Sequence, residues 1–131
     1  MGICNLKRID ECISARKRVH DRYFERLNGI DGITLCYPQD GVESNYSYFP
    51  VLFEKDKFGK SRDDVFAKLR EHEVYARKYF YPAINDMSCY EYLKGPETPI
   101  AHEVSLNILT LPLYEELELE DVDRICDIIL S

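Results

Sequence analysis

The chain has 131 residues, of which 45% are hydrophobic and 31% are charged, with only six glycines and six prolines. These values are typical of one folded domain of a soluble protein and exclude a disordered or low-complexity chain. The formal net charge is -7, from 24 acidic and 17 basic residues. Because the basic residues are also dispersed, the charge argues against a binder of nucleic acid or of anionic membranes.

The five cysteines and three histidines are isolated along the chain. The sequence contains no C-x-x-C pair and no zinc-ligand spacing, and an odd number of cysteines does not suit a disulfide framework. This pattern favours a reducing, cytoplasmic compartment and a protein without a bound metal. No apolar run reaches the length of a membrane span, and residues 1–20 carry too many charges for a signal peptide.

The first part of the chain predicts one long helix and two strands. Apolar residues recur at helical spacing over Ile3–Leu27, and at about 1.5 Å per residue this helix is at least as long as so small a domain is wide. We therefore expect one of its ends to project or to pack against something outside the chain. A short strand is expected at Ile33–Tyr37, and the aromatic run Asn45–Glu54 is the strongest strand signal. Pro50 lacks an N–H, so the strand should lie at a sheet edge there or carry a bulge.

A second helix and a third strand are expected in the middle of the chain. Ser61 can cap a helix over Arg62–His72, and Asp64 stands where its carboxylate can complete a capping box. The run Val74–Tyr81 is predicted to be a strand that Pro82 ends. Residues 83–97 are expected to be irregular.

The last part of the chain predicts two further helices. Thr98 followed by Pro99 favours a helix that runs to about Asn107. Residues 109–117 are expected to be extended, and acidic residues 120 and 121 favour the start of a final helix. Its apolar face is formed by Val122, Ile125, Ile128 and Ile129. The elements together predict an α+β fold over residues 1–131, a single domain with a small, mostly antiparallel sheet covered by helices.

The run YARKYFY, residues 75–81, concentrates aromatic and basic side chains. In a strand, alternation places Arg77, Tyr79 and Tyr81 on one face and turns Lys78 to the other. A guanidinium fork among phenols can hold a phosphate or sugar hydroxyls. The alternative is a half-exposed edge strand whose tyrosines pack on a helix. The aromatic run at residues 46–49 is expected to form core, and the acidic residues 115–121 to be solvated rather than to bind a metal.

Four segments, in order, resemble the C-terminal part of the DegT/StrS family of pyridoxal-phosphate (PLP) dependent nucleotide-sugar aminotransferases. The helix MGICNLKRIDECISARKRVHDRYFERL has the family's Gly-x-x-x-Leu-x-x-Ile-Asp opening. The other segments are NYSYFPVLF, VYARKYFYPAI and ILTLPLYEELELEDVDRICDII. The resemblance spans nearly the whole chain.

This resemblance implies that a large N-terminal domain is missing. In the family that domain carries the lysine to which PLP is bound covalently. Met1 falls where family members often have an internal Met, so the chain resembles an excised C-terminal domain. We expect PLP in the full-length parent and none in this chain alone, which is therefore predicted to be inactive. Lys78 is not assigned as the cofactor lysine, because alternation turns it away from Tyr79.

The resemblance further implies a parent that transfers an amino group, typically from glutamate, to a keto-sugar on a nucleoside diphosphate in deoxysugar biosynthesis. It places Tyr79 at a position next to the substrate, while Arg77 and Tyr81 follow as substrate contacts from the alternation alone. The sequence RKYFYP resembles the corresponding segment of family members that act on deoxythymidine-diphosphate-linked amino-deoxy sugars. A homodimeric parent is expected.

Two other functions stay open. The chain is alternatively a free-standing α+β module that binds a small anion or nucleotide through Arg77 and the tyrosines, without catalysis. A cofactor-free scaffold role is the third possibility. If the chain is a fragment, we expect an exposed apolar patch near the helix of residues 3–27 or beside Tyr46 and Tyr48.

Overall fold

The computed structural model describes residues 6–90, 92 and 97–131. Its centre is an antiparallel sheet of three strands in the order β1-β2-β3: β1 is Ile33–Leu35, β2 is Phe49–Phe53 and β3 is Ile108–Leu111. The helices are α2 (Ile9–Leu27), α3 (Lys55–Phe58), α4 (Arg62–Glu71), α5 (Pro99–Asn107) and α6 (Leu119–Leu130), with 3-10 turns η1 (Ile84–Asp86) and η2 (Ser88–Tyr90). The α+β class with a small antiparallel sheet covered by helices is confirmed.

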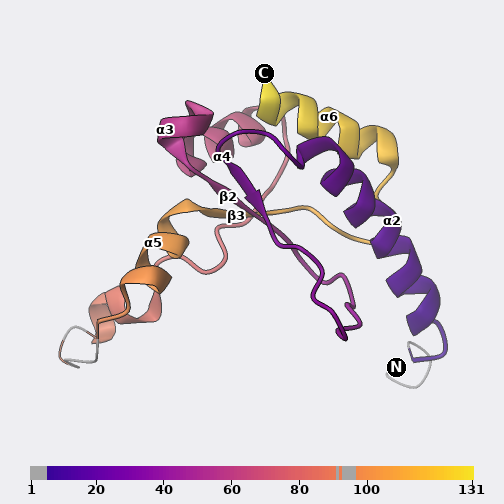
Figure 1. The fold of residues 1–131 in the computed structure, drawn as a ribbon, viewed down its shortest axis with the longest axis horizontal. Helices are drawn as coiled ribbons and strands as arrows, with labels where there is room; N and C mark the ends of the chain where they lie inside the picture. The colour runs from indigo at the N-terminus through magenta and orange to yellow at the C-terminus, as the bar shows by residue number, and fades with distance from the viewer. Residues whose placement is uncertain (1–5, 91, 93–96) are drawn as a thin grey trace.

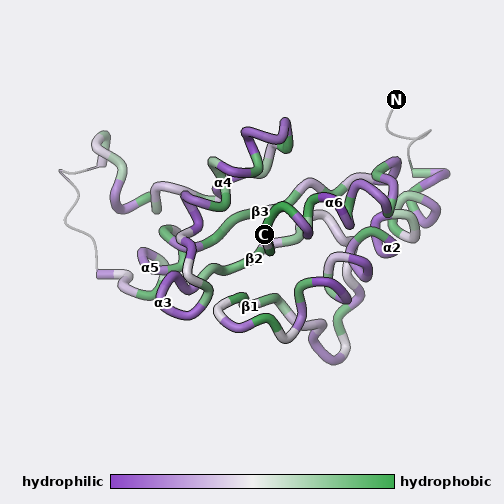
Figure 2. Tube along the Cα trace, turned by 90° about the horizontal axis from the view of Figure 1, so that it is seen from above, coloured by the Kyte–Doolittle hydropathy of each residue, from purple (hydrophilic) through white to green (hydrophobic). Residues whose placement is uncertain are grey.

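The helices divide between two sides of the sheet. Helix α6 packs against both α2 and α4, whereas α5 contacts β2 at the opposite end of the molecule (Figure 1). Strands β2 and β3 carry hydrophobic stretches through the middle of the molecule (Figure 2). The buried core draws on the sheet and on α2, α4 and α6, and includes Tyr23, Leu27, Val51, Phe53, Leu69, Leu109, Val122 and Ile129. Burial of this apolar surface is the main stabilising term of the fold.

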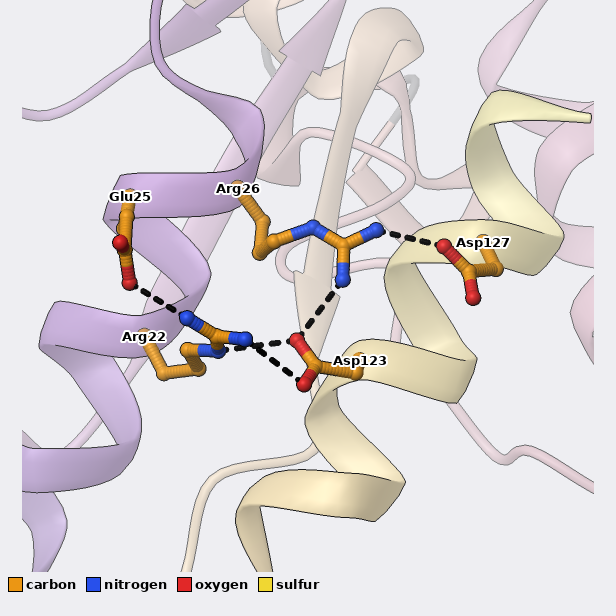
Figure 3. Close-up of polar contacts among 5 residues, drawn as sticks. All are labelled: Arg22, Glu25, Arg26, Asp123 and Asp127. Carbon is orange, nitrogen blue, oxygen red and sulfur yellow. Dashed lines mark hydrogen bonds and ion pairs between the residues drawn. The ribbon is translucent and has the colours of Figure 1, made fainter.

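Ion pairs fasten α2 to α6 across the outside of the core (Figure 3). Arg22 donates from Nε and Nη2 to the two carboxylate oxygens of Asp123, at 2.9 and 2.8 Å. Arg26 donates from Nη1 to Asp123 at 2.8 Å and from Nη2 to Asp127 at 2.5 Å. The hydrogen bonds from Arg22 hold the pKa of Asp123 below its ordinary value.

The long N-terminal helix is confirmed from Ile9 to Leu27, while residues 3–5 of the expected range lie outside the described residues. Its buried residues, Val19, Tyr23 and Leu27, all lie in the second half. The first half therefore extends beyond the core (Figure 1), as its length predicted. Ile9, at its start, is 40% exposed.

Strand β2 is shorter than expected, because the first four residues of the predicted range do not pair. Pro50 pairs with Thr110 of β3, but β1 pairs only as far as Val51. Thr110 exchanges both its backbone hydrogen bonds with Arg77, so the Pro50 backbone points away from β3. The proline nitrogen therefore faces an unpaired edge, which confirms the expectation that an edge accommodates it.

The predicted strand at Val74–Tyr81 is wrong. Only Arg77 pairs, in a single bridge to Thr110 with N···O distances of 2.9 and 2.7 Å. To extend this bridge in one direction, the next residue that would have to exchange backbone hydrogen bonds with the Arg77 segment is Pro112, which has no N–H. On the other side, the Ile108 N–H bonds the Val104 carbonyl and its carbonyl accepts from Arg62. With these groups occupied the ladder cannot continue, and the chain turns at Tyr79.

The remaining helices agree with the sequence. The capping box of α4 is present in both directions between Ser61 and Asp64. Helix α5 begins after Thr98 as expected, but the Thr98 hydroxyl accepts from Asn85 at 3.1 Å and does not cap the helix. The short helix α3 lies where only a turn was expected. Within the described ranges, no helix is long and apolar enough to cross a membrane.

Candidate functional site

Arg77 and Tyr79 lie together at the margin of the sheet. The bridge to Thr110 fixes the Arg77 backbone, and its Nη1 donates to the Tyr79 hydroxyl. Both side chains line a cavity of about 380 Å³ together with Tyr48, Tyr75 and Tyr114. The lining combines phenol groups with one guanidinium, so this cavity offers hydrogen-bond donors, acceptors and flat ring faces to a polar ligand.

A second, mainly apolar cavity of about 570 Å³ adjoins the first one. Tyr48, Tyr79 and Thr110 line both cavities. The rings of Tyr48 and Tyr79 meet edge to face, with centroids 5.9 Å apart. The far wall of the apolar cavity is formed by α5, through Ala101 and Val104. Tyr79 therefore stands where a polar and an apolar cavity meet.

The expected common face of Arg77, Tyr79 and Tyr81 is wrong for Tyr81. Its ring lies 4.7 Å from the guanidinium of Arg62, on the side of α4, and it does not line either cavity. The reason is the turn at Tyr79, which ends the alternation of side chains on which the expectation relied. Substrate contact by Arg77 and Tyr79 stays a prediction.

Lys78 is held against α4, away from the two cavities. Its Nζ lies 2.6 Å from an Asp63 carboxylate oxygen and 4.5 Å from the centre of the Phe66 ring. The hydrogen bond from Lys78 holds the pKa of Asp63 below its ordinary value. None of the described residues that line the two cavities is a lysine. These residues therefore do not fit a site where PLP is bound covalently.

Several residues of the site were not found from the sequence. The aromatic run at residues 46–49 was expected to form core, but only Phe49 is buried, and Tyr48 is 58% exposed. Tyr114 and α5 were not connected with the site, since it is the bridge between Arg77 and Thr110 that brings β3 and the segments on either side of it to Tyr79. One signal in the sequence could have pointed to Tyr48. Side chains alternate along a strand, so a buried Phe49 turns Tyr48 to the opposite face. In the described ranges, no group of three or more His, Cys, Asp or Glu residues is arranged to hold a metal.

Comparison with known proteins gives the same assignment from sequence and from structure. Residues 1–130 match the DegT/DnrJ/EryC1/StrS aminotransferase family. The chain is 39% identical over 133 residues to a dTDP-4-amino-4,6-dideoxy-D-glucose transaminase of Escherichia coli, covering 99% of this chain and 36% of that protein. An enzyme of the same name from Shigella dysenteriae is 34% identical over 125 residues, 95% of this chain and 34% of its own length.

Among solved structures, DesI in the presence of its TDP-sugar product superposes with a TM-score of 0.92 at 25% identity, over 99% of this chain and 33% of DesI. The apo-form of a putative sugar aminotransferase, Spr1654 of Streptococcus pneumoniae, gives 0.85 at 25% identity, over 98% of this chain and 32% of that chain. The chain thus spans about a third of the length of the relatives it matches. With a family match from end to end, the chain belongs to the DegT/DnrJ/EryC1/StrS aminotransferase family.

Proposed function

We propose that this chain is the C-terminal domain of a PLP-dependent nucleotide-sugar aminotransferase. The full-length enzyme transfers an amino group from glutamate to the 4-keto group of a dTDP-linked 6-deoxy sugar. The observation that carries this proposal is the 39% identity, over 99% of the chain, to an enzyme named dTDP-4-amino-4,6-dideoxy-D-glucose transaminase. The substrate class suggested by RKYFYP is the same.

In this proposal the chain forms one wall of the substrate site. Arg77 has five N–H donors, and its contact with Tyr79 leaves others for the diphosphate of the nucleotide. Hydroxyl groups of Tyr48 and Tyr79 hydrogen-bond the sugar, and the ring faces exclude water from it. The chain orients the keto-sugar, which is how binding residues lower a reaction barrier.

The cofactor belongs to the rest of the parent protein. PLP, when bound, supplies the electron sink that amino transfer requires. Lys78 is paired with Asp63 and lies outside both cavities, which supports placing the cofactor lysine in the rest of the parent protein. The contribution of this chain is therefore substrate binding, and the domain alone is expected to be inactive. The complete enzyme is proposed to be a homodimer.

The test uses the complete coding sequence that contains this chain. The purified protein is incubated with glutamate and dTDP-4-keto-6-deoxy-D-glucose, and 2-oxoglutarate is measured together with the dTDP-linked amino sugar by mass spectrometry. We expect equal amounts of the two products, and a large loss of product in Tyr79→Ala.

A Lys78→Met variant tests the lysine itself, and its readout is the PLP absorbance of the full-length protein, because Lys78 takes part in holding the Tyr79 segment through Asp63. The variant should keep that absorbance, whereas its loss would overturn the assignment of the lysine to another domain. If the coding sequence begins at Met1 and the protein binds dTDP without amino transfer, the free-standing binding module replaces this proposal.

A further inference from the structure

We propose that Arg62 is a positioning residue for the substrate wall, an inference that rests on the proposed function. Arg62 lies at the start of α4 and is 1% exposed. It lines neither of the two cavities. It contacts both the end of α5 and the segment after Arg77, and the apolar cavity lies between these two segments.

The first tie holds the end of α5. The Nη1 group of Arg62 donates to the backbone carbonyls of Ser105 and Ile108, at 3.2 and 3.1 Å. These carbonyls belong to the last turn of α5 and to the residue that starts β3. Carbonyls at a helix C-terminus have no partner within the helix, so a buried cation satisfies them and fixes the direction in which α5 leaves the sheet.

The second tie holds the segment after Arg77. The guanidinium of Arg62 lies 4.7 Å from the centre of the Tyr81 ring, and its Nε donates to Asp63 at 2.7 Å. Asp63 in turn bonds Lys78 at 2.6 Å. One arginine therefore anchors the chain on both sides of Tyr79, directly through Tyr81 and indirectly through Lys78.

The apolar cavity lies between the two tied segments. Tyr79 and Phe80 form one side and Ala101 and Val104 of α5 form the other. By accepting from Arg62, the Ile108 carbonyl is also withdrawn from pairing with the Tyr79 segment, which allows the turn there. Arg62 thus sets both the position of Tyr79 and its separation from α5.

A guanidinium suits this role because its donors point in fixed, divergent directions and its face stacks on a ring. An apolar side chain of similar size fills the same space but holds neither carbonyl, and buried charges are often no more stabilising than such a replacement. Lysine keeps the charge but has no planar fork. The three chemistries can therefore be separated by substitution.

The first experiment measures position in the 131-residue chain by nuclear magnetic resonance. Arg62→Met is expected to shift the signals of Tyr79 and Val104 and to reduce the exchange protection of the Arg77 amide, which bonds Thr110. Leu69→Ala is the matched control: it is a fully buried residue of the same helix. The proposal is overturned if the two variants change these signals equally. Should Arg62→Met not fold, Arg62→Lys carries the test, with the same signals moved by a smaller amount.

The second experiment measures kcat and KM in the full-length enzyme. Misplacing a substrate-binding group by about 1 Å costs on the order of 100-fold. We expect Arg62→Met to lower kcat/KM by about this factor, mainly by raising KM for the nucleotide-sugar, and Arg62→Lys to recover about tenfold of it. Leu69→Ala, assayed below its unfolding temperature, should leave both constants near wild type. An unchanged KM in Arg62→Met overturns the positioning role, whereas an inactive wild-type enzyme overturns the proposed function and leaves the resonance experiment to decide on Arg62.

Discussion

Replacing Tyr23 by phenylalanine is expected to stabilise the protein. Tyr23 is fully buried in α2 and stacks on Phe49 with ring centroids 5.0 Å apart. Its hydroxyl has no hydrogen-bond partner among the residues that the structure describes, and burial raises the pKa of the phenol, which stays neutral. A buried hydroxyl without a partner costs about 1–3 kcal/mol. Tyr23→Phe removes this cost and keeps the ring.

We expect a gain of about 1 kcal/mol in the free energy of unfolding, because the small void left by the oxygen offsets part of the benefit. This gain corresponds to a rise of about 4 °C in Tm. Urea unfolding measures it as a higher midpoint at an unchanged m-value. Tyr23→Ala, which removes the ring as well, should instead lose about 3–5 kcal/mol. A destabilisation of about 1 kcal/mol or more in Tyr23→Phe, which is the size of a typical hydrogen bond's contribution, would show that the hydroxyl is hydrogen-bonded and refute the reasoning.

Three further predictions concern other parts of the fold. Burial raises the pKa of Cys126 to about 12, so at pH 8 a thiol reagent should label exposed Cys36 rapidly and Cys126 only on unfolding; equal rates would contradict the buried position. Gly32 has φ +76°, and a Cβ there would lie 2.3 Å from a backbone nitrogen of α3, whereas Gly29, at φ +79°, has open space. Thermal unfolding should therefore show Gly29→Ala destabilised by about 1 kcal/mol and Gly32→Ala by at least about 1 kcal/mol more, and similar losses would count against the contact. Because the pKa of Asp123 is lowered by folding, its contribution to stability is full above its ordinary value of 3.8 and is lost as the pH falls through the folded value. Urea midpoints of wild type and Asp123→Asn should differ at pH 7 and converge as the pH falls below 3.8, and a constant difference would argue against the ion pairs.

Local patterns predicted the helices well because each carries its own signals. The capping box of Ser61 and Asp64 and the apolar stripe of α6 depend only on neighbouring residues, and both are present. The strand predicted at Val74–Tyr81 was wrong because backbone pairing there depends on competition between groups that are distant in the sequence. Arg77 meets Thr110, but Ile108 is already bonded to Arg62. No spacing along the chain reports that competition.

The candidate site was predictable to the extent that it is local. Arg77 and Tyr79 lie together and line a cavity, as the concentration of aromatic and basic side chains in their segment suggested. Tyr81 does not share their face, because the turn at Tyr79 ends the alternation of side chains. An apolar patch was expected near the first helix or beside Tyr46 and Tyr48. Tyr48 is exposed, and Phe80 and Ile84, which line the same apolar cavity, add exposed apolar surface that the sequence did not indicate.

The most direct test of the central claim is whether Arg77 binds the nucleotide part of the substrate. Isothermal titration of the full-length protein with dTDP compares wild type, Arg77→Met and Arg124→Met, the last an exposed arginine of α6 that donates to the His72 carbonyl. Hydrogen bonds to a charged group contribute about 1.5–3 kcal/mol, so Arg77→Met should raise the Kd for dTDP by about 10-fold to 100-fold. Arg124→Met should bind dTDP as wild type does. Equal Kd values for wild type and Arg77→Met would contradict the assignment of this wall to the nucleotide-sugar.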